Sequence, residues 1–143
     1  MQPKFLFLNG NLSELQDVAA ETARFCRDHH LDGEVEFHLT LALEELFTNA
    51  VRYGGCAGVA RSVKFELRKE PGAVLVDFAD CGRPFDPTTA PSPDLNAPLE
   101  SRQAGGLGIH LVRQIMRDLR YERSDGWNRV TMRRPLHEDT PCK

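Results

Sequence analysis

Residues 39–54 read LTLALEELFTNAVRYG, and the rest of the chain can be interpreted around this stretch. Apolar residues recur through it and the preceding turn at intervals of three and four, which predicts a helix with one buried face. Glu45 and Asn49 lie four residues apart on one flank of that face, so both side chains can reach the same pocket. Considered alone, the pair is also consistent with ordinary polar residues at the edge of a packed helix. The predicted buried face consists of Val35, Leu39, Ala42, Leu43, Leu46, Phe47 and Ala50.

The composition is typical of a globular domain. The chain has 143 residues, of which 41% are hydrophobic and 27% are charged, and its formal net charge is -3. This length is sufficient to bury a single core, so we expect one domain spanning residues 1–143. The sequence has no sustained basic run, which predicts that nucleic acid is not a partner. No apolar run reaches the length of a membrane-spanning helix, so a cytoplasmic protein without a membrane contact is expected.

The spacing of the cysteines predicts neither a metal site nor a disulfide framework. Cys26, Cys56, Cys81 and Cys142 form no C-x-x-C pair and are not grouped with histidines at metal-ligand spacing. We therefore expect reduced thiols and no metal site built from side chains alone.

The chain before the central helix predicts a strand followed by a first helix. Residues 4–8 form a short run rich in Phe and Leu, and Asn9-Gly10 after it favours a turn. Apolar residues then recur at helical spacing from Ser13 to about His30, where residues 31–33 interrupt the pattern. Two helices are therefore expected to lie side by side.

Two strands are predicted after the glycine-rich break at residues 54–58. Residues 63–68 alternate between apolar and charged side chains, and Pro71-Gly72 predicts a turn into a second strand over residues 73–80. The apolar face of this second strand includes Asp80, whose carboxylate should point inward. A buried carboxylate is costly unless donors meet it. Asp80 therefore either caps the following turn or contacts a ligand.

Residues 83–104 form a long proline-rich segment without periodicity. Loops longer than roughly 15 residues inside a compact domain are usually lids, binding loops or disordered segments, so this segment is a candidate to close over a ligand. It ends in the run GGLG at residues 105–108, and apolar residues from Ile109 to Leu119 then recur at helical spacing. The glycines should therefore lie at a helix N-terminus, where free backbone N–H groups attract anions such as phosphate.

Two closing strands are predicted near residues 120–123 and 129–133, with Asp125-Gly126 as their turn. The complete order is strand, helix, helix, strand, strand, lid, helix, strand, strand. This order predicts an α+β fold, a two-layer sandwich in which helices cover one face of a mixed, mostly antiparallel sheet.

Three short motifs in this order resemble the nucleotide-binding boxes of the gyrase, histidine kinase and MutL ATPase superfamily, which shares the Bergerat-type ATP-binding fold. They are the pair Glu45 and Asn49, the run Asp80-Cys81-Gly82, and the run Gly106-Leu107-Gly108. Within the superfamily, the runs ELFTNA, DCGRPFDP and GGLGIHL are most similar to the anti-sigma-factor serine/threonine kinases of bacterial partner-switching systems. The resemblance covers nearly the whole chain.

The resemblance implies a role for each motif. Asn49 would hold Mg²⁺ against the phosphates of ATP, and Asp80 would accept a hydrogen bond from the adenine amino group, which is the donor that an inward carboxylate needs. Gly82 would be the close backbone neighbour of the base, and residues 83–105 would form the ATP lid. The residues facing the phosphates would be Gly106, Leu107 and Gly108.

Glu45 distinguishes between reaction classes. A serine hydroxyl is a poor nucleophile that needs a positioned base, whereas a neutral imidazole already presents a lone pair. In the catalytic domains of histidine kinases the matching position is typically an amide, whereas here it is a carboxylate. This predicts transfer of the γ-phosphoryl group of ATP to a serine or threonine of a partner protein, with Glu45 as the catalytic base.

The resemblance also implies partners. An anti-sigma-factor antagonist would supply the phospho-acceptor serine, a sigma factor or similar regulator would be sequestered, and a homodimer is expected. Two alternatives use the same pocket: a nucleotide-sensing binding module that transfers no phosphate, and an ATPase that activates water with the same glutamate. A detached histidine kinase catalytic domain is disfavoured by Glu45 and by the missing phospho-acceptor helix.

Overall fold

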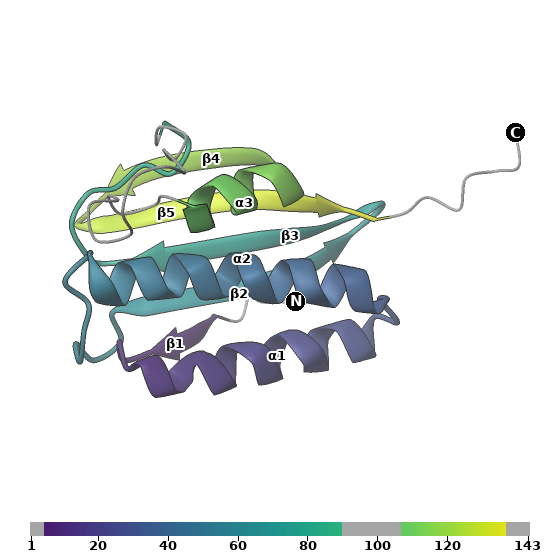
Figure 1. The fold of residues 1–143 in the computed structure, drawn as a ribbon, viewed down its shortest axis with the longest axis horizontal. Coiled ribbons are helices and arrows are strands. Elements are labelled where there is room, and N and C mark those ends of the chain that lie inside the picture. The colour runs from purple at the N-terminus through teal and green to yellow at the C-terminus, as the bar shows by residue number, and fades with distance from the viewer. Residues whose placement is uncertain (1–4, 90–106, 137–143) are drawn as a thin grey trace, which may run out of the picture.

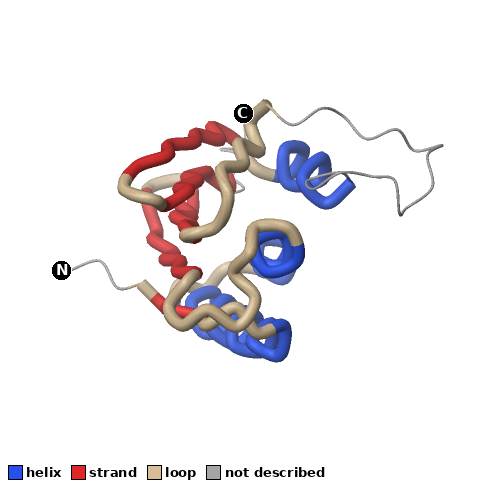
Figure 2. Tube along the Cα trace, turned by 90° about the vertical axis from the view of Figure 1, so that its left-hand side faces the viewer, coloured by secondary structure: helices blue, strands red, loops and turns tan. Residues whose placement is uncertain are grey.

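The computed structural model describes residues 5–89 and 107–136. Within these residues, a five-stranded sheet is covered on one face by α-helices (Figure 1). The view along the sheet shows the helices on the same side of the strands (Figure 2). The predicted α+β two-layer sandwich is therefore confirmed.

The strands and helices follow the predicted order. The sheet order is β1-β2-β3-β5-β4, and each neighbouring pair is antiparallel. The sheet was expected to be mixed, but the described strands pair only in the antiparallel sense. The elements are β1 (Leu6–Leu8), a short 3₁₀ helix (Leu12–Glu14), α1 (Leu15–Asp28), α2 (Gly33–Arg52), β2 (Val63–Glu70), β3 (Ala73–Asp80), α3 (Leu107–Ile115), β4 (Arg117–Ser124) and β5 (Trp127–Pro135).

Helix α2 is the central helix predicted from the apolar pattern. It begins after Asp32, whose side chain accepts a hydrogen bond of 3.0 Å from the backbone N–H of Val35 and so satisfies a free donor of the first turn. All seven residues of the predicted apolar face are buried, together with Val51. The helix packs against α1, α3 and the sheet, so its flanks are fixed from several sides.

The core lies between these helices and the inner face of the sheet. Phe47 of α2, Phe65 of β2 and Phe78 of β3 are among its largest fully buried side chains. The inward residues of β3 end at Asp80, which pairs with Asn128 of β5 across the sheet. The packing of this core therefore holds a polar pair at the end of the two central strands.

The boundary between α3 and β4 differs from the sequence prediction. The helix was expected to continue to Leu119, but it ends at Ile115, and Leu119 packs on the core from within β4. Asp118 has a positive φ of 58°, and the pairing of β4 with β5 is irregular between Arg117 and Arg120. At this irregularity Leu119 packs against the core from a strand. Its position in the sequence also fits the helical spacing of the preceding apolar residues, which is why the helix was predicted to be longer.

Two further observations concern the described residues. No helix among them is both long enough and apolar enough to cross a membrane. Cys26, Cys56 and Cys81 are free thiols, of which Cys81 is exposed. Burial raises the pKa of the Cys26 and Cys56 thiols to about 11 in each case.

Candidate functional site

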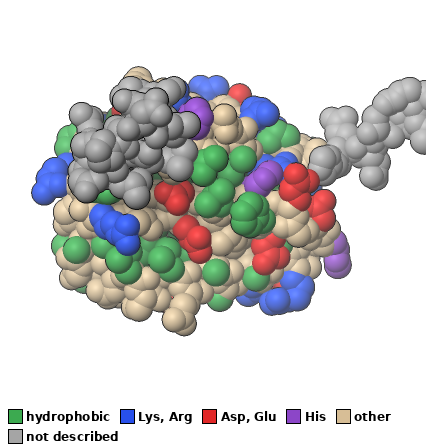
Figure 3. All heavy atoms as spheres, viewed as in Figure 1, with side chains coloured by type: hydrophobic (Ala, Val, Ile, Leu, Met, Phe, Trp, Pro, Cys, Tyr) green, Lys and Arg blue, Asp and Glu red, His purple; other side chains and the backbone are tan. Residues whose placement is uncertain are grey.

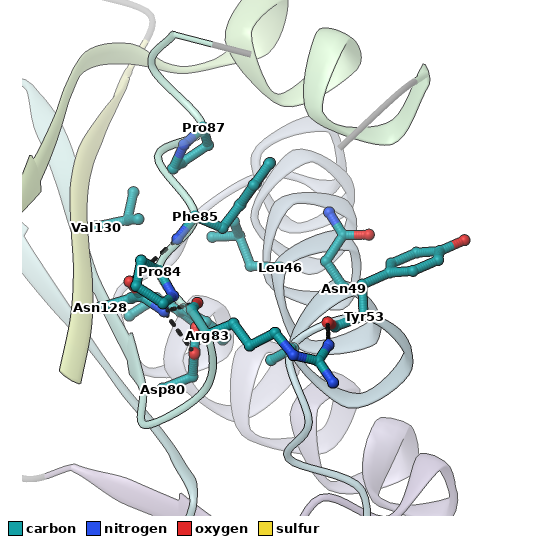
Figure 4. A pocket seen from close by; sticks show the side chains of 13 residues that line it. Leu46, Asn49, Tyr53, Asp80, Arg83, Pro84, Phe85, Pro87, Asn128 and Val130 are labelled. Carbon is teal, nitrogen blue, oxygen red and sulfur yellow. Dashed lines mark hydrogen bonds between the residues drawn. The ribbon is translucent and has the colours of Figure 1, made fainter. Parts of the chain in front are cut away.

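A cavity of about 160 Å³ lies between the second half of α2 and the ends of β3 and β5 (Figure 4). Pockets that enclose a whole drug-sized ligand are usually roughly 300–1,000 Å³. This cavity is therefore suited to one end of a larger molecule. Its walls are Leu46, Asn49, Ala50, Tyr53 and Gly54 from α2 and its end, Phe78 and Asp80 from β3, Arg83, Pro84, Phe85 and Pro87 from the following loop, and Asn128 and Val130 from β5.

Asp80 lies in the wall of this cavity, as the sequence predicted. Its Oδ1 accepts a hydrogen bond of 2.9 Å from the backbone N–H of Gly82 and one of 3.0 Å from Nδ2 of Asn128. Burial raises the pKa of Asp80, and these two hydrogen bonds and the charge of Arg123 oppose the shift. Within the described residues no donor is bonded to Oδ2. Asp80 is therefore both the cap of the following turn and a carboxylate with one acceptor oxygen left for a ligand.

Asn128 is a functional-site residue that the sequence reasoning missed. It is 3% exposed, and its Oδ1 accepts hydrogen bonds from the hydroxyl of Tyr121 at 2.6 Å and the backbone N–H of Phe85 at 3.3 Å. Its Nδ2 also donates to the backbone oxygen of Arg83 at 2.7 Å. The strand pattern could have indicated it. Asn128 lies two residues before Val130 and four before Met132, so it shares their buried face of the strand, and a polar residue on such a face needs a partner.

The loop after β3 is pressed against the end of α2. The backbone N–H of Arg83 donates to the oxygen of Gly54 at 2.8 Å, and its guanidinium donates to the backbone oxygen of Tyr53. A Cβ on Gly82 would lie 2.5 Å from the backbone oxygen of Gly54, a distance that side chains do not tolerate. Only glycine therefore permits this close approach, and the loop closes one wall of the cavity.

Asn49 also lines the cavity, and its side chain lacks a protein partner. Its Nδ2 atom is buried and has no hydrogen-bond partner among the described residues. An unpaired buried amide costs roughly 1–3 kcal/mol, so this atom is a contact point for a ligand, an ion or an ordered water. The Nδ2 of Asn49 can donate a hydrogen bond to an acceptor oxygen of a ligand, and its Oδ1 can coordinate a cation.

Glu45 lies one helical turn before Asn49, outside the cavity wall and next to α3. A Cβ built on Gly108 would lie 1.8 Å from Glu45 Oε1, so the carboxylate occupies the space that a side chain would take. Burial raises the pKa of Glu45, the charge of Glu44 raises it further, and the charge of Arg52 lowers it. The structure thus brings together Glu45, Asn49 and Gly108, which the sequence assigned to one site.

Part of the predicted site lies outside the described residues. Gly106 and most of the predicted lid, residues 90–105, fall in this part. Leu107 is described only as the first residue of α3. The beginning of the lid, residues 83–89, is described and runs along the cavity.

The helix-covered face carries acidic side chains over α2, some of them beside hydrophobic ones (Figure 3). A triphosphate bound along this helix would be repelled by these carboxylates. A divalent cation would offset the repulsion, and Asn49 supplies an oxygen of the kind that Mg²⁺ prefers. The donor set is therefore compatible with Mg²⁺ held between Asn49 and phosphate.

A family model described as the histidine kinase-like ATPase domain matches residues 8–134. This range includes the cavity and all of the described site residues. The chain therefore belongs to the histidine kinase-like ATPase domain family, and the resemblance to this superfamily that the three motifs indicated is confirmed.

The chain is also similar to individual proteins within and around this family. The serine/threonine-protein kinase BtrW of Bordetella bronchiseptica is 38% identical over 100 residues, which are 70% of this chain and 70% of that protein. The solved structure of the RsbU and RsbW domains of Rv1364c from Mycobacterium tuberculosis has a TM-score of 0.68 at 16% identity, covering 95% of this chain and 33% of the solved chain. The histidine kinase AdeS of Acinetobacter baumannii has a TM-score of 0.50 at 14% identity, covering 96% of this chain and 70% of the other. At these identities the two structures bear on the fold alone.

Proposed function

We propose that this protein is an ATP-dependent serine/threonine-protein kinase that transfers the γ-phosphoryl group of ATP to a hydroxyl of a partner protein. The relative BtrW, which bears this activity in its name, supports the proposal. The observation that carries it is the position of Glu45, a partly desolvated carboxylate next to Gly108 on the flank of α2 that also bears Asn49.

The cavity is proposed to hold the adenine. The free Oδ2 of Asp80 accepts from the amino group of the base, and Gly82 allows the backbone to approach it closely. The rest of the nucleotide extends past Asn49 towards Glu45, because the cavity is too small for a whole nucleotide. The phosphates face Gly106, Leu107 and Gly108, and residues 83–105 form the lid.

Glu45 is proposed as the general base. Its carboxylate accepts the proton of the serine or threonine hydroxyl while the hydroxyl oxygen forms the new bond to the γ-phosphorus and the bond to the ADP oxygen breaks. A raised pKa makes Glu45 a better proton acceptor than an exposed glutamate when it is ionised. Mg²⁺, held by Asn49, supplies charge neutralisation on the phosphates when it is bound.

The partners are proposed from the motif resemblance. The acceptor is an anti-sigma-factor antagonist that carries a serine, and the regulator that is sequestered is a sigma factor or an analogous protein. A homodimer is proposed on the same resemblance.

The test replaces Glu45→Gln and uses Glu44→Gln as its matched control. Both variants remove one carboxylate from adjacent positions of α2. With a recombinant anti-sigma-factor antagonist of the same organism and radiolabelled ATP, we expect Glu45→Gln to lower transfer by about 10²–10⁴-fold, the usual contribution of a positioned base. ATP affinity, measured by calorimetry, should stay within about threefold, because Glu45 does not line the cavity.

Other results would assign a different function. Wild-type protein that binds ATP but phosphorylates none of the antagonists would be a nucleotide-sensing module, in which ATP sets the lid conformation. Unchanged transfer by Glu45→Gln would remove Glu45 from the role of base. Phosphate released to water at the same rate with and without the antagonist would indicate an ATPase.

A further inference from the structure

We infer that Asn128 is the positioning residue that sets the base specificity of the nucleotide site, with Tyr121 as its support. This inference rests on the proposed function, because it concerns how the same cavity selects adenine. Neither residue belongs to the three motifs, and both come from the closing hairpin formed by β4 and β5.

The side chain of Asn128 uses all of its hydrogen-bonding capacity. A carboxamide donates two hydrogen bonds and accepts about two. In the structure Nδ2 donates to Asp80 and to the backbone of Arg83, and Oδ1 accepts from Tyr121 and from the backbone of Phe85. The side chain is therefore fixed in one orientation, with its donor end towards Asp80.

This orientation makes the two carboxylate oxygens of Asp80 different. Nδ2 of Asn128 and the backbone N–H of Gly82 both bond to Oδ1, at 3.0 and 2.9 Å. Within the described residues Oδ2 receives no hydrogen bond, and Asp80 lines the cavity. The carboxylate is thus held so that one oxygen is an unshared acceptor. Such an acceptor favours the amino group of adenine and disfavours a carbonyl oxygen at the same place on a base.

Tyr121 fixes the oxygen end of the Asn128 amide. Its hydroxyl donates to Asn128 Oδ1 at 2.6 Å. This bond favours the orientation of the amide in which the oxygen faces β4 and the nitrogen faces Asp80. Figure 4 shows the bonds of Asn128 to Asp80 and to the loop. An amide turned the other way would place oxygen against the Asp80 carboxylate, which is repulsive. The chain Tyr121–Asn128–Asp80 therefore holds the acceptor in place before a base arrives.

Asn128 also connects the base to the loop over the cavity. The same side chain bonds to the carbonyl of Arg83 and the N–H of Phe85, and both residues line the cavity. Asn128 therefore contributes to the position of both the acceptor oxygen and the loop that closes the wall.

The test compares two nucleotides that differ in a single group. ATP and purine riboside triphosphate carry the same phosphates, but the second lacks the exocyclic amino group of adenine. Their ratio of dissociation constants, measured by calorimetry with Mg²⁺, reports the contact with Asp80 alone. We expect the wild type to bind ATP at least about tenfold more tightly than purine riboside triphosphate, because only ATP makes the hydrogen bond to the charged Asp80.

Asn128→Asp keeps the shape and the accepting oxygen of the side chain but replaces the donor that faces Asp80. We expect the preference for ATP to fall to within about twofold of unity, while binding of purine riboside triphosphate changes by less than about threefold. Tyr121→Phe removes only the supporting hydroxyl and should reduce the preference partially. Asn11→Asp, which makes the same charge change at an exposed helix cap, should leave the preference unaltered.

A wild-type preference in Asn128→Asp, or an equal loss of affinity for both nucleotides, would overturn the inference and leave the proposed function intact. If Asn128→Asp does not fold, as judged by circular dichroism, Tyr121→Phe decides, and an unchanged preference in that variant overturns the inference. A wild-type protein that binds neither nucleotide would refute the proposed function and this inference together.

Discussion

Replacing Gly108→Ala tests whether Glu45 is held in a catalytic position by the glycine next to it. An added Cβ would lie 1.8 Å from Oε1, 2.6 Å from Cδ and 3.2 Å from Cγ of Glu45. Since real Cβ contacts essentially never fall under 3.0 Å, the carboxylate must move by more than about 1 Å. The atoms involved are the far end of a flexible side chain, so the displacement is easy for the fold and harmful for the position of the base.

The expected magnitudes separate stability from catalysis. Alanine is favoured over glycine by about 0.5–1 kcal/mol inside a helix, so α3 should be no less stable in the variant. A misplacement of about 1 Å can cost about 10²-fold in rate. We therefore expect phosphotransfer to fall by about 10²-fold while the free energy of unfolding stays within about 1 kcal/mol. Gly108 is also proposed to face the phosphates, so ATP affinity should fall, but by much less than phosphotransfer, because Gly108 does not line the cavity proposed to hold the adenine.

The assay measures phosphotransfer to the antagonist, ATP affinity by calorimetry and unfolding by denaturant on the same preparations. Gly33→Ala is the matched control, since Gly33 is the first residue of α2 and a Cβ there meets nothing within 4 Å. Full transfer in Gly108→Ala would mean that the position of Glu45 is not catalytic. An equal loss of transfer and ATP affinity would mean that the substitution acts through the contact with the phosphates and not through the position of Glu45.

Two further predictions follow from the raised pKa values. The pKa of Asp80 is raised by burial, so the wild type should lose stability as pH rises from about 4 through the raised pKa. Asp80→Asn removes this loss of stability. In thermal melting at pH 4 and pH 7.5, the variant should therefore gain stability relative to the wild type at the higher pH. Its ATP affinity should fall about tenfold or more, because the acceptor for the adenine amino group is lost. The opposite trend with pH would contradict the assignment of the charge penalty to Asp80. For catalysis, the charge of Glu44 contributes to the raised pKa of Glu45, so Glu44→Gln should shift the rising limb of the pH–rate profile to lower pH and keep the plateau rate within about twofold. A shift to higher pH would refute this coupling.

The fold was predictable because its elements have strong periodic patterns. The apolar face of α2 predicts a helical period and the alternation over residues 63–68 predicts a strand, and the structure has a helix and a strand at these positions. The end of α3 was not predictable in this way. Ile115, Met116 and Leu119 fit a helical period, and a bulge at Arg117 to Arg120 that depends on pairing with β5 shifts Leu119 into a strand. A pairing irregularity of this kind leaves no mark in the sequence spacing.

The site was predictable where a motif is local and not where it depends on sheet register. Glu45 and Asn49 lie on one helix flank, so their spacing alone places them together. Asn128 lies 48 residues after Asp80 and meets it only because β3 and β5 pair with those two residues in register. The register depends on the packing of the whole sheet, so the hairpin was interpreted from sequence as two closing strands without a role.

Glu45, Asp80 and Asn49 each carry a polar group that is at least partly buried at a cost in free energy. The pKa of Glu45 and the pKa of Asp80 are both raised by burial, and Nδ2 of Asn49 is buried without a partner in the described part of the chain. Each of these features is unfavourable for folding, and a packed apolar residue would avoid it. Asn49 and Asp80 line one cavity and Glu45 lies one helical turn beyond it, and this concentration is difficult to explain by folding alone. A nucleotide with an amino donor, phosphate oxygens and a bound cation offers partners to Asp80 and Asn49, and the hydroxyl of the acceptor protein offers one to Glu45. Binding would therefore restore to the folded state part of the stability that the site removes.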